Sequence, residues 1–122
     1  MSNEVMIEKP WGYELIWART DKYVGKILHI VEGTQLSLQY HKVKDETIYL
    51  QSGEMELVIE ESGRRNSLLL NPGDARHIPP GTIHRMIART TCDVLEVSTT
   101  ELDDVVRLED DFGRADSEGG SK

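Results

Sequence analysis

The sequence predicts an all-β domain built from short strands. The first observation is alternation: in Glu54–Glu61 (EMELVIEE) apolar residues alternate with acidic ones, which is typical of a strand with one buried face. The second is spacing, because turn-forming runs such as Ser62–Asn66 (SGRRN) and Asn71–Asp74 (NPGD) separate such segments. Short strands joined in this way are typical of sandwiches and barrels.

The N-terminal third of the chain predicts two strands and an assembly. Residues 1–8 form a polar lead-in, and Lys9–Gly12 (KPWG) is a turn before a strand at Tyr13–Ala18. The next strand, Tyr23–Val31 (YVGKILHIV), is largely apolar on both faces and should be covered on both sides. A second subunit can supply one of the covers. We therefore expect a homodimer whose interface includes this strand or its N-terminal neighbour.

The stretch Gly33–Gly53 (GTQLSLQYHKVKDETIYLQSG) predicts a two-stranded hairpin. Alternation places Gln39 and His41 on one face of its first strand. Lys44–Asp45 is the predicted turn, and Glu46 opens the second strand. A hairpin of this kind can aim Gln39, His41 and Glu46 at a single point, and these side chains suit a metal ion.

The rest of the chain continues the pattern of short strands. After residues 54–61 we expect strands at residues 67–70, 75–78, 82–89 and 93–99, with a rigid corner at Pro79–Gly81 (PPG). Residues 101–111 (ELDDVVRLEDD) are either a helical turn or an extended arm, and periodicity does not decide between them. Residues 115–122 are expected to be a disordered tail. Residues 9–114 then form a single domain, which is long enough for a core of its own.

Composition limits the classes of partner. The chain has 14 Lys+Arg against 22 Asp+Glu, a formal net charge of -8, which disfavours nucleic acid and anionic membrane surfaces as partners. An anionic small molecule would still bind where a few cations gather. Cys92 is the only cysteine, so no disulfide forms within the chain, as expected in a reducing cytoplasm. No apolar run approaches the length of a membrane span, so we expect a soluble, cytoplasmic protein.

Two motifs of fixed spacing lie in the central part of the chain. The first is Gly33-x5-Gln39-x-His41-x4-Glu46-x6-Gly53, and the second is Gly73-x5-Pro79-x-Gly81-x2-His84. Together they resemble the two motifs of the cupin family, in which the position of Gln39 is usually histidine and that of Ala88 is often asparagine. The resemblance implies a small double-stranded β-helix, a jelly-roll cupin barrel, which is commonly a dimer.

A narrower resemblance extends over residues 9–114. The runs KPWG (residues 9–12), LSLQYH (36–41) and LDDVVRLEDDFGR (102–114) are similar to the C-terminal cupin domain of type II mannose-6-phosphate isomerase/mannose-1-phosphate guanylyltransferase enzymes. The sequence departs from that pattern at residues 42–48 (KVKDETI), where the family usually has Arg before the Glu and His-Trp after it. No nucleotidyltransferase domain is present in these residues, so we expect no nucleotide chemistry from them.

The cupin resemblance implies one divalent metal ion as cofactor. Its ligands would be His41, Glu46 and His84, and Gln39 would add an amide oxygen. Two imidazoles and two oxygens suit Zn²⁺, Mn²⁺, Fe²⁺, Co²⁺ or Ni²⁺, and the sequence does not rank them. Either histidine alone would more simply be an ordinary buried side chain with a hydrogen-bond partner, but the joint spacing favours metal binding.

Three basic residues are candidates for substrate binding. Lys26 shares a strand face with Leu28 and Ile30, so it either contacts a phosphate or hydroxyl inside the barrel or lies at an exposed strand end. Arg107 and Arg114 match the C-terminal arginines of the narrower family, which implies a phosphate clamp. The alternative is that they pair with neighbouring carboxylates.

Three functional hypotheses remain open. The family resemblance favours an aldose–ketose isomerase acting on a sugar phosphate, resembling mannose-6-phosphate isomerase. Its proton-transfer base is not identified from sequence, and Lys26 is only a candidate. The alternatives are a non-catalytic cupin that binds a sugar or metabolite through its metal, and an Fe-dependent dioxygenase. Arg107 and Arg114 favour a phosphorylated sugar over the apolar substrate of a dioxygenase. They do not separate isomerase from binder.

Overall fold

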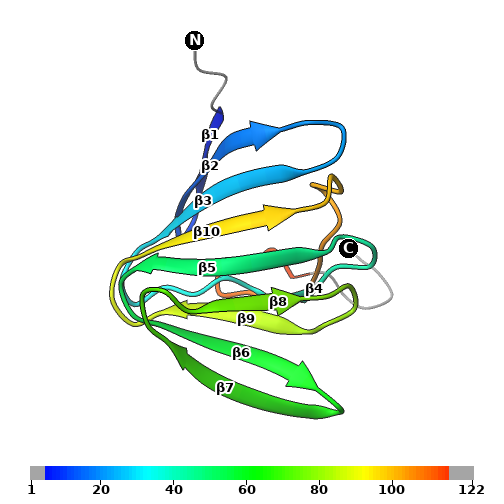
Figure 1. The fold of residues 1–122 in the computed structure, drawn as a ribbon. Coiled ribbons are helices and arrows are strands. Elements are labelled where there is room, and N and C mark those ends of the chain that lie inside the picture. Colours follow the sequence, from blue (N-terminus) through cyan, green and yellow to red (C-terminus); the bar gives the residue numbers. More distant parts are fainter. Residues whose placement is uncertain (1–4, 116–122) are drawn as a thin grey trace.

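The computed structural model describes residues 5–115, which form two antiparallel sheets (Figure 1). The six-stranded sheet has the order β1-β2-β3-β10-β5-β8, and the five-stranded sheet has the order β11-β4-β9-β6-β7. The jelly-roll-like arrangement confirms the predicted all-β class. The strand bounds are β1 Val5–Lys9, β2 Gly12–Arg19, β3 Val24–Ile30, β4 Leu38–Tyr40, β5 Glu46–Ser52, β6 Met55–Glu61, β7 Arg64–Leu70, β8 Ala75–Ile78, β9 His84–Ala88, β10 Cys92–Ser98 and β11 Val106–Glu109.

The expected polar lead-in contains a strand. Strand β1 pairs antiparallel with β2 at the edge of the six-stranded sheet, and its register joins Lys9 to Gly12 across the intervening turn. Gly12 has a φ of 149° and lies against the backbone carbonyl of His29, where any Cβ would collide. Trp11 in the same turn is buried in the core. The turn therefore fixes both the pairing of β1 and one end of the core.

The predicted hairpin at residues 33–53 is wrong. Strand β4 belongs to the five-stranded sheet and β5 to the six-stranded sheet, so the chain crosses from one layer to the other between them. At the entry to β4, Leu36, Ser37 and Leu38 are buried in succession, so simple alternation fails there. The carbonyl of His41 accepts a hydrogen bond from the backbone N–H of Gly81, which is not part of β5. Long-range pairing of this kind overrides the local turn pattern.

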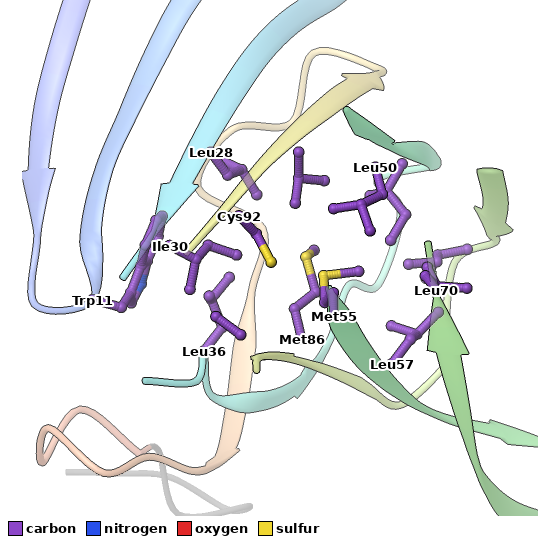
Figure 2. Packing of buried hydrophobic residues seen from close by; sticks show 14 of the residues in the cluster. Trp11, Leu28, Ile30, Leu36, Leu50, Met55, Leu57, Leu70, Met86 and Cys92 are labelled. Carbon is purple, nitrogen blue, oxygen red and sulfur yellow. The ribbon is translucent and has the colours of Figure 1, made fainter. Parts of the chain in front are cut away.

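A hydrophobic core fills the space between the sheets (Figure 2). Met55, Leu57 and Ile59 of β6 are fully buried, as their alternation predicts. Trp11 lies at one end of the cluster and Leu70 at the other (Figure 2). Burial of each such large side chain contributes about 1.5–3 kcal/mol to folding.

Strand β3 has one fully buried face and one partly buried face. Its inward side chains, including Leu28 and Ile30, lie in the core. On the other face the indole ring of Trp17 lies against Gly25, and Trp17 itself remains 49% exposed. Tyr49 and Val97 on the neighbouring strands β5 and β10 are also about half exposed. The outer face of β3 is thus only partly covered by residues of its own chain, and the homodimer stays a prediction.

The C-terminal segment, for which two conformations were open, is extended. Strand β11 pairs antiparallel with β4, and Arg107 stands opposite Gln39 in this register. Residues 99–114 are here called the C-terminal arm, and their strand β11 forms one edge of the five-stranded sheet. Residues 116–122, most of the expected tail, lie outside the described range. Within residues 5–115 there is no helix long and apolar enough to cross a membrane.

Candidate metal centre and cavity

The side chains of His41, Glu46 and His84 converge between the two sheets. His41 directly follows β4, Glu46 begins β5, and His84 begins β9. Glu46 Oε2 lies 3.5 Å from His41 Nε2 and 3.3 Å from His84 Nε2. All three side chains are buried, and one potential ligand atom from each lies within 4.8 Å of the others. The cluster could therefore hold a metal ion.

Backbone carbonyls orient both imidazole rings. His41 Nδ1 lies 2.6 Å from the carbonyl oxygen of Asp104, and His84 Nδ1 lies 2.9 Å from that of Thr82. A carbonyl can only accept, so each Nδ1 carries the proton and donates it. In the neutral ring the lone pair is then on Nε2, which faces Glu46 in both residues. This is the arrangement commonly found around metal-bound histidines.

The atoms that face one another lack ordinary hydrogen-bond partners. Among the described residues, His41 Nε2 and His84 Nε2, which face Glu46 Oε2, are buried without a hydrogen bond. Glu46 Oε1 also lacks a hydrogen bond, although it lies 3.1 Å from Lys44 Nζ. Two nitrogen lone pairs and a carboxylate are all acceptors, so their burial together is unfavourable unless a cation or a proton lies between them. A divalent cation satisfies this donor set, and the residues present therefore fit the metal that the family resemblance implies.

Glu46 is the anionic member of the cluster. Burial raises the pKa of its carboxyl group, but the contacts with His41 and His84 and the charge of Lys44 outweigh burial. Its pKa lies well below the ordinary value, so the group is a carboxylate at neutral pH. A carboxylate between two imidazoles leaves positions open for water or substrate on a bound metal.

Sequence reasoning missed Lys44 and Glu96, which lie beside the cluster. Lys44 was expected in a turn. It is buried in the crossing between the sheets, with its Nζ 3.0 Å from Glu96 Oε2 and 3.1 Å from Glu46 Oε1. The second distance lacks hydrogen-bond geometry, since Glu46 Oε1 has no hydrogen-bond partner. Burial lowers the pKa of Lys44, but the charges of Glu96 and Glu46 outweigh it and raise the pKa above its usual range. Lys44 is thus a permanent cation.

The inward position of Glu96 could have been predicted by alternation in the last expected strand. Val94, Glu96 and Ser98 are all buried on the inner face of β10, with Val94 in the core. Burial raises the pKa of Glu96, and the charge of Glu46 raises it further, against the opposing charges of Lys44 and Lys26. No comparable pattern predicts the burial of Lys44, because that burial depends on the crossing between the sheets.

Lys26 lies inside the barrel. It is 6% exposed, and its Nζ lies 3.3 Å from Glu14 Oε1 on the adjacent strand β2. The alternative of an exposed strand end does not hold. Lys26 also lines the same cavity as His41 and Glu46, so its ammonium group is near the cluster and already paired with a carboxylate.

The other predicted site residues, Gln39, Arg107 and Arg114, also line this cavity, and they differ in their contacts. Gln39 stands opposite His84 in the pairing of β4 with β9, and its Oε1 accepts a hydrogen bond from Ser37 Oγ at 3.2 Å. Arg107 lines the cavity from β11. Arg114 also lines it, but its Nε and Nη2 donate to Asp110 at 2.9 and 3.0 Å. Arg114 therefore makes the neighbouring-carboxylate pairing that the sequence left open.

The cavity gathers positive charge in an acidic protein. Its volume is about 100 Å³, and apolar residues of the core such as Leu28 and Met86 form part of its wall. Its lining includes five basic residues, Lys9, Lys26, Lys44, Arg107 and Arg114, against three carboxylates, Glu14, Glu46 and Glu96. The local balance is opposite in sign to the net charge of -8. Such a lining favours an anionic ligand.

Comparison with known proteins adds a family match. The family model described as a cupin domain matches residues 26–98. The xanthan biosynthesis protein XanB of Xanthomonas campestris is 31% identical over 114 residues, which cover 88% of this chain and 23% of XanB. The mannose-1-phosphate guanylyltransferase of Escherichia coli is 32% identical over 114 residues, again with 88% and 23% covered. The chain thus spans under a quarter of the length of these relatives.

A solved structure shares the architecture. The structure of KdgF from Halomonas sp. matches with a TM-score of 0.68 at 22% identity, covering 81% of this chain and 88% of that one. At this level of identity the likeness supports the fold.

Proposed function

This chain belongs to the cupin domain family, and on that premise we propose that it is a metal-dependent cupin that acts on a sugar phosphate, most simply as an aldose–ketose isomerase. The observation that carries the proposal is the pair of histidine Nε2 atoms facing Glu46. Both are buried without a hydrogen-bond partner among the described residues, and both rings are oriented through Nδ1. A site that is prepared in this way suits a cation.

One divalent ion would be held by His41, Glu46 and His84, with the amide oxygen of Gln39 as a fourth ligand. When bound, such an ion supplies Lewis-acid polarisation of the carbonyl and hydroxyl oxygens that exchange roles in an aldose–ketose conversion. Zn²⁺ or Mn²⁺ would serve, since the conversion involves no net redox change.

The basic residues of the cavity support a phosphorylated ligand. Arg107 and Arg114 enter the cavity from the C-terminal arm and can provide charge-assisted hydrogen bonds to a phosphate group. Lys44 adds a fixed positive charge beside Glu46. The names of the relatives, a xanthan biosynthesis protein and a mannose-1-phosphate guanylyltransferase, agree with a sugar as the underlying class.

Proton transfer between neighbouring carbons needs a base within the cavity. Lys26 already has a carboxylate partner, since its Nζ lies 3.3 Å from Glu14 Oε1, and this placement suits hydrogen-bond donation to a substrate oxygen. Glu96 also lines the cavity, where burial moves the pKa of its carboxyl group upward and Lys44 Nζ donates to its Oε2 at 3.0 Å. Glu96 is therefore a second candidate for the base, beside Lys26.

A non-catalytic metal-dependent sugar- or metabolite-binding cupin is the second candidate. It is favoured by the intramolecular pairing of Lys26 with Glu14 and of Arg114 with Asp110, because paired groups need not take part in chemistry. An Fe-dependent dioxygenase would use the same ligand set, but the charged lining of the cavity is a poor match for an apolar substrate. The proposal also places the protein in the cytoplasm, where the lone thiol of Cys92 stays reduced.

Elemental analysis followed by NMR in D₂O tests the proposal. Purified protein should contain one equivalent of a divalent metal, and incubation with mannose 6-phosphate should yield fructose 6-phosphate with deuterium at the carbon next to the carbonyl. Chelated protein is the matched control and should not turn over. Metal and sugar-phosphate binding without turnover across hexose and pentose phosphates would establish the binder instead, and protein without metal would exclude both.

A further inference from the structure

Asp104 makes an unusual number of contacts with the segment between two of the candidate ligands. Its carboxylate accepts the backbone N–H groups of Lys42 at 3.0 Å, Val43 at 2.7 Å and Lys44 at 2.8 Å. Its own carbonyl oxygen accepts from His41 Nδ1 at 2.6 Å. One residue of the C-terminal arm thus contacts four consecutive residues, from His41 to Lys44.

This segment depends on Asp104 for its backbone hydrogen bonds. Residues 41–45 lie outside any strand, where the chain crosses from β4 in one sheet to β5 in the other. Backbone N–H groups in such a crossing need partners, and an aspartate at this point supplies acceptors for three of them. Burial raises the pKa of Asp104, but the N–H groups of Lys42, Lys44 and Val43 outweigh it and lower the pKa, as expected of a carboxylate that is held ionised.

The two kinds of contact act on the metal cluster in different ways. The carbonyl oxygen keeps the proton of His41 on Nδ1 and so leaves the Nε2 lone pair directed at Glu46. The carboxylate fixes the short link that separates His41 from Glu46 and carries Lys44. A displacement of this link would change the His41–Glu46 distance, on which any shared metal depends.

We propose that Asp104 is a positioning residue for the metal centre, acting on His41 through its carbonyl oxygen and on residues 42–44 through its carboxylate. The inference rests on the proposed metal function and adds a role for the C-terminal arm. The arm also lines the cavity with Leu102, Val105 and Arg107. One segment therefore both borders the cavity and orients a candidate metal ligand.

Asp104→Asn is the appropriate variant, with Asp103→Asn as its matched control. The asparagine has nearly the same shape, but it keeps one acceptor oxygen and turns an NH₂ donor toward the backbone N–H groups. Asp103 is exposed, and among the described residues its carboxylate has no hydrogen bond, so its replacement changes the net charge equally without touching the link. The affinity of the full chain for Zn²⁺ is measured by competition with a chelator. Asp104→Asn should bind Zn²⁺ about 10- to 100-fold more weakly, and Asp103→Asn as wild type does.

A second measurement does not need the metal. Imidazole nitrogen NMR of the metal-free protein, at a pH where His41 is neutral, reports which ring nitrogen carries the proton. Wild type and Asp103→Asn should show the Nδ1–H form. Asp104→Asn keeps the backbone carbonyl, but without the carboxylate contacts to residues 42–44 this carbonyl should shift away from His41 Nδ1, which gives a mixture of tautomers. A merely structural role would lower stability without changing the tautomer.

The outcomes separate the positioning role of Asp104 from the proposed metal-dependent function. Equal Zn²⁺ affinities for Asp104→Asn and Asp103→Asn, or an Nε2–H tautomer of His41 in wild type, would overturn the positioning role even if the protein binds metal. If wild type binds no metal, the proposed function fails, and the tautomer comparison still decides whether Asp104 orients His41. Should Asp104→Asn not fold, the wild-type tautomer decides alone.

Discussion

His84 Nε2 lies 3.3 Å from Glu46 Oε2 although the two residues belong to different sheets. His84 begins β9 in the five-stranded sheet, and Glu46 begins β5 in the six-stranded sheet. The candidate metal centre therefore lies between the layers rather than on one hairpin. An ion bound there would connect the two sheets, in addition to any chemistry it supports.

The first prediction concerns the ligand set. His41→Ala or His84→Ala should lose most of the bound metal, because the remaining ligands cannot close the site. His29→Ala is the matched control, since His29 pairs with Asp93 away from the cluster. Elemental analysis after gel filtration gives the stoichiometry. Full metal content in both ligand variants would show that the assigned set is wrong.

The second prediction separates a phosphate clamp from surface ion pairs. Arg107→Ala or Arg114→Ala should weaken the binding of mannose 6-phosphate by roughly ten- to a hundredfold, about 1.5–3 kcal/mol per charge-assisted hydrogen bond. Binding of unphosphorylated mannose should hardly change, because it never made the contact. Calorimetric titration with both ligands measures the difference, and Arg65→Ala, on an exposed arginine paired with Glu60, is the control.

Two results would contradict the clamp. Equal losses for the sugar and its phosphate would indicate a general loosening of the cavity. Unchanged affinity of the Arg114→Ala variant for mannose 6-phosphate would mean that the Arg114 guanidinium binds Asp110 and not the ligand.

The third prediction is a pH dependence that arises from Asp110. Burial raises the pKa of its carboxyl group, but the hydrogen bonds and charge of Arg114 outweigh burial, so the pKa is lowered in the native state. A lowered native pKa stabilises the fold above the unfolded value of about 3.9, and this stabilisation is lost as the pH falls through the native pKa. Urea unfolding of wild type should therefore show falling stability in acid. Asp110→Asn should have a flatter acid limb, whereas Asp103→Asn should keep the wild-type slope. An unchanged slope in Asp110→Asn would refute the assignment.

The fourth prediction is a homodimer built on the outer face of the six-stranded sheet. Trp17, Tyr49 and Val97 on this face are about half exposed, and the cover that the apolar strand β3 requires is incomplete within one chain. Sedimentation at micromolar concentration should give twice the mass of one chain. A charge at the centre of the face, as in Val97→Glu, should produce monomers. A monomeric wild type would count against the prediction.

Local pattern predicted the parts of the fold that local forces determine. The alternation of Met55, Leu57 and Ile59 correctly placed β6 and its buried face, because one side of that strand lies against the core. The spacing of His41, Glu46 and His84 predicted three side chains that do converge. The strand arrangement that brings them together was predicted wrongly. A hairpin turn at Lys44 and a crossing between two sheets have the same local sequence pattern.

What the sequence could not provide depends on distant pairing. The ammonium group of Lys44 is buried against Glu96 and Glu46 of the six-stranded sheet, and Asp104 contacts the same link from the C-terminal arm. Periodicity within residues 101–111 carried no information about that contact, since the arm is ordered by its pairing with β4. The partnership of Arg114 with Asp110 is local, and the sequence left it as one of two alternatives.

The basic lining of the cavity also has a kinetic consequence. On the proposed function, an incoming phosphate group would meet the field of a chain with net charge -8 before it reached the five basic residues that line the cavity. The Debye length is about 8 Å at physiological ionic strength, so added salt first screens the repulsion outside and only weakly affects contacts within the cavity. Encounter and retention of an anion are therefore governed by opposite charges: the exterior slows its arrival, while the interior slows its escape.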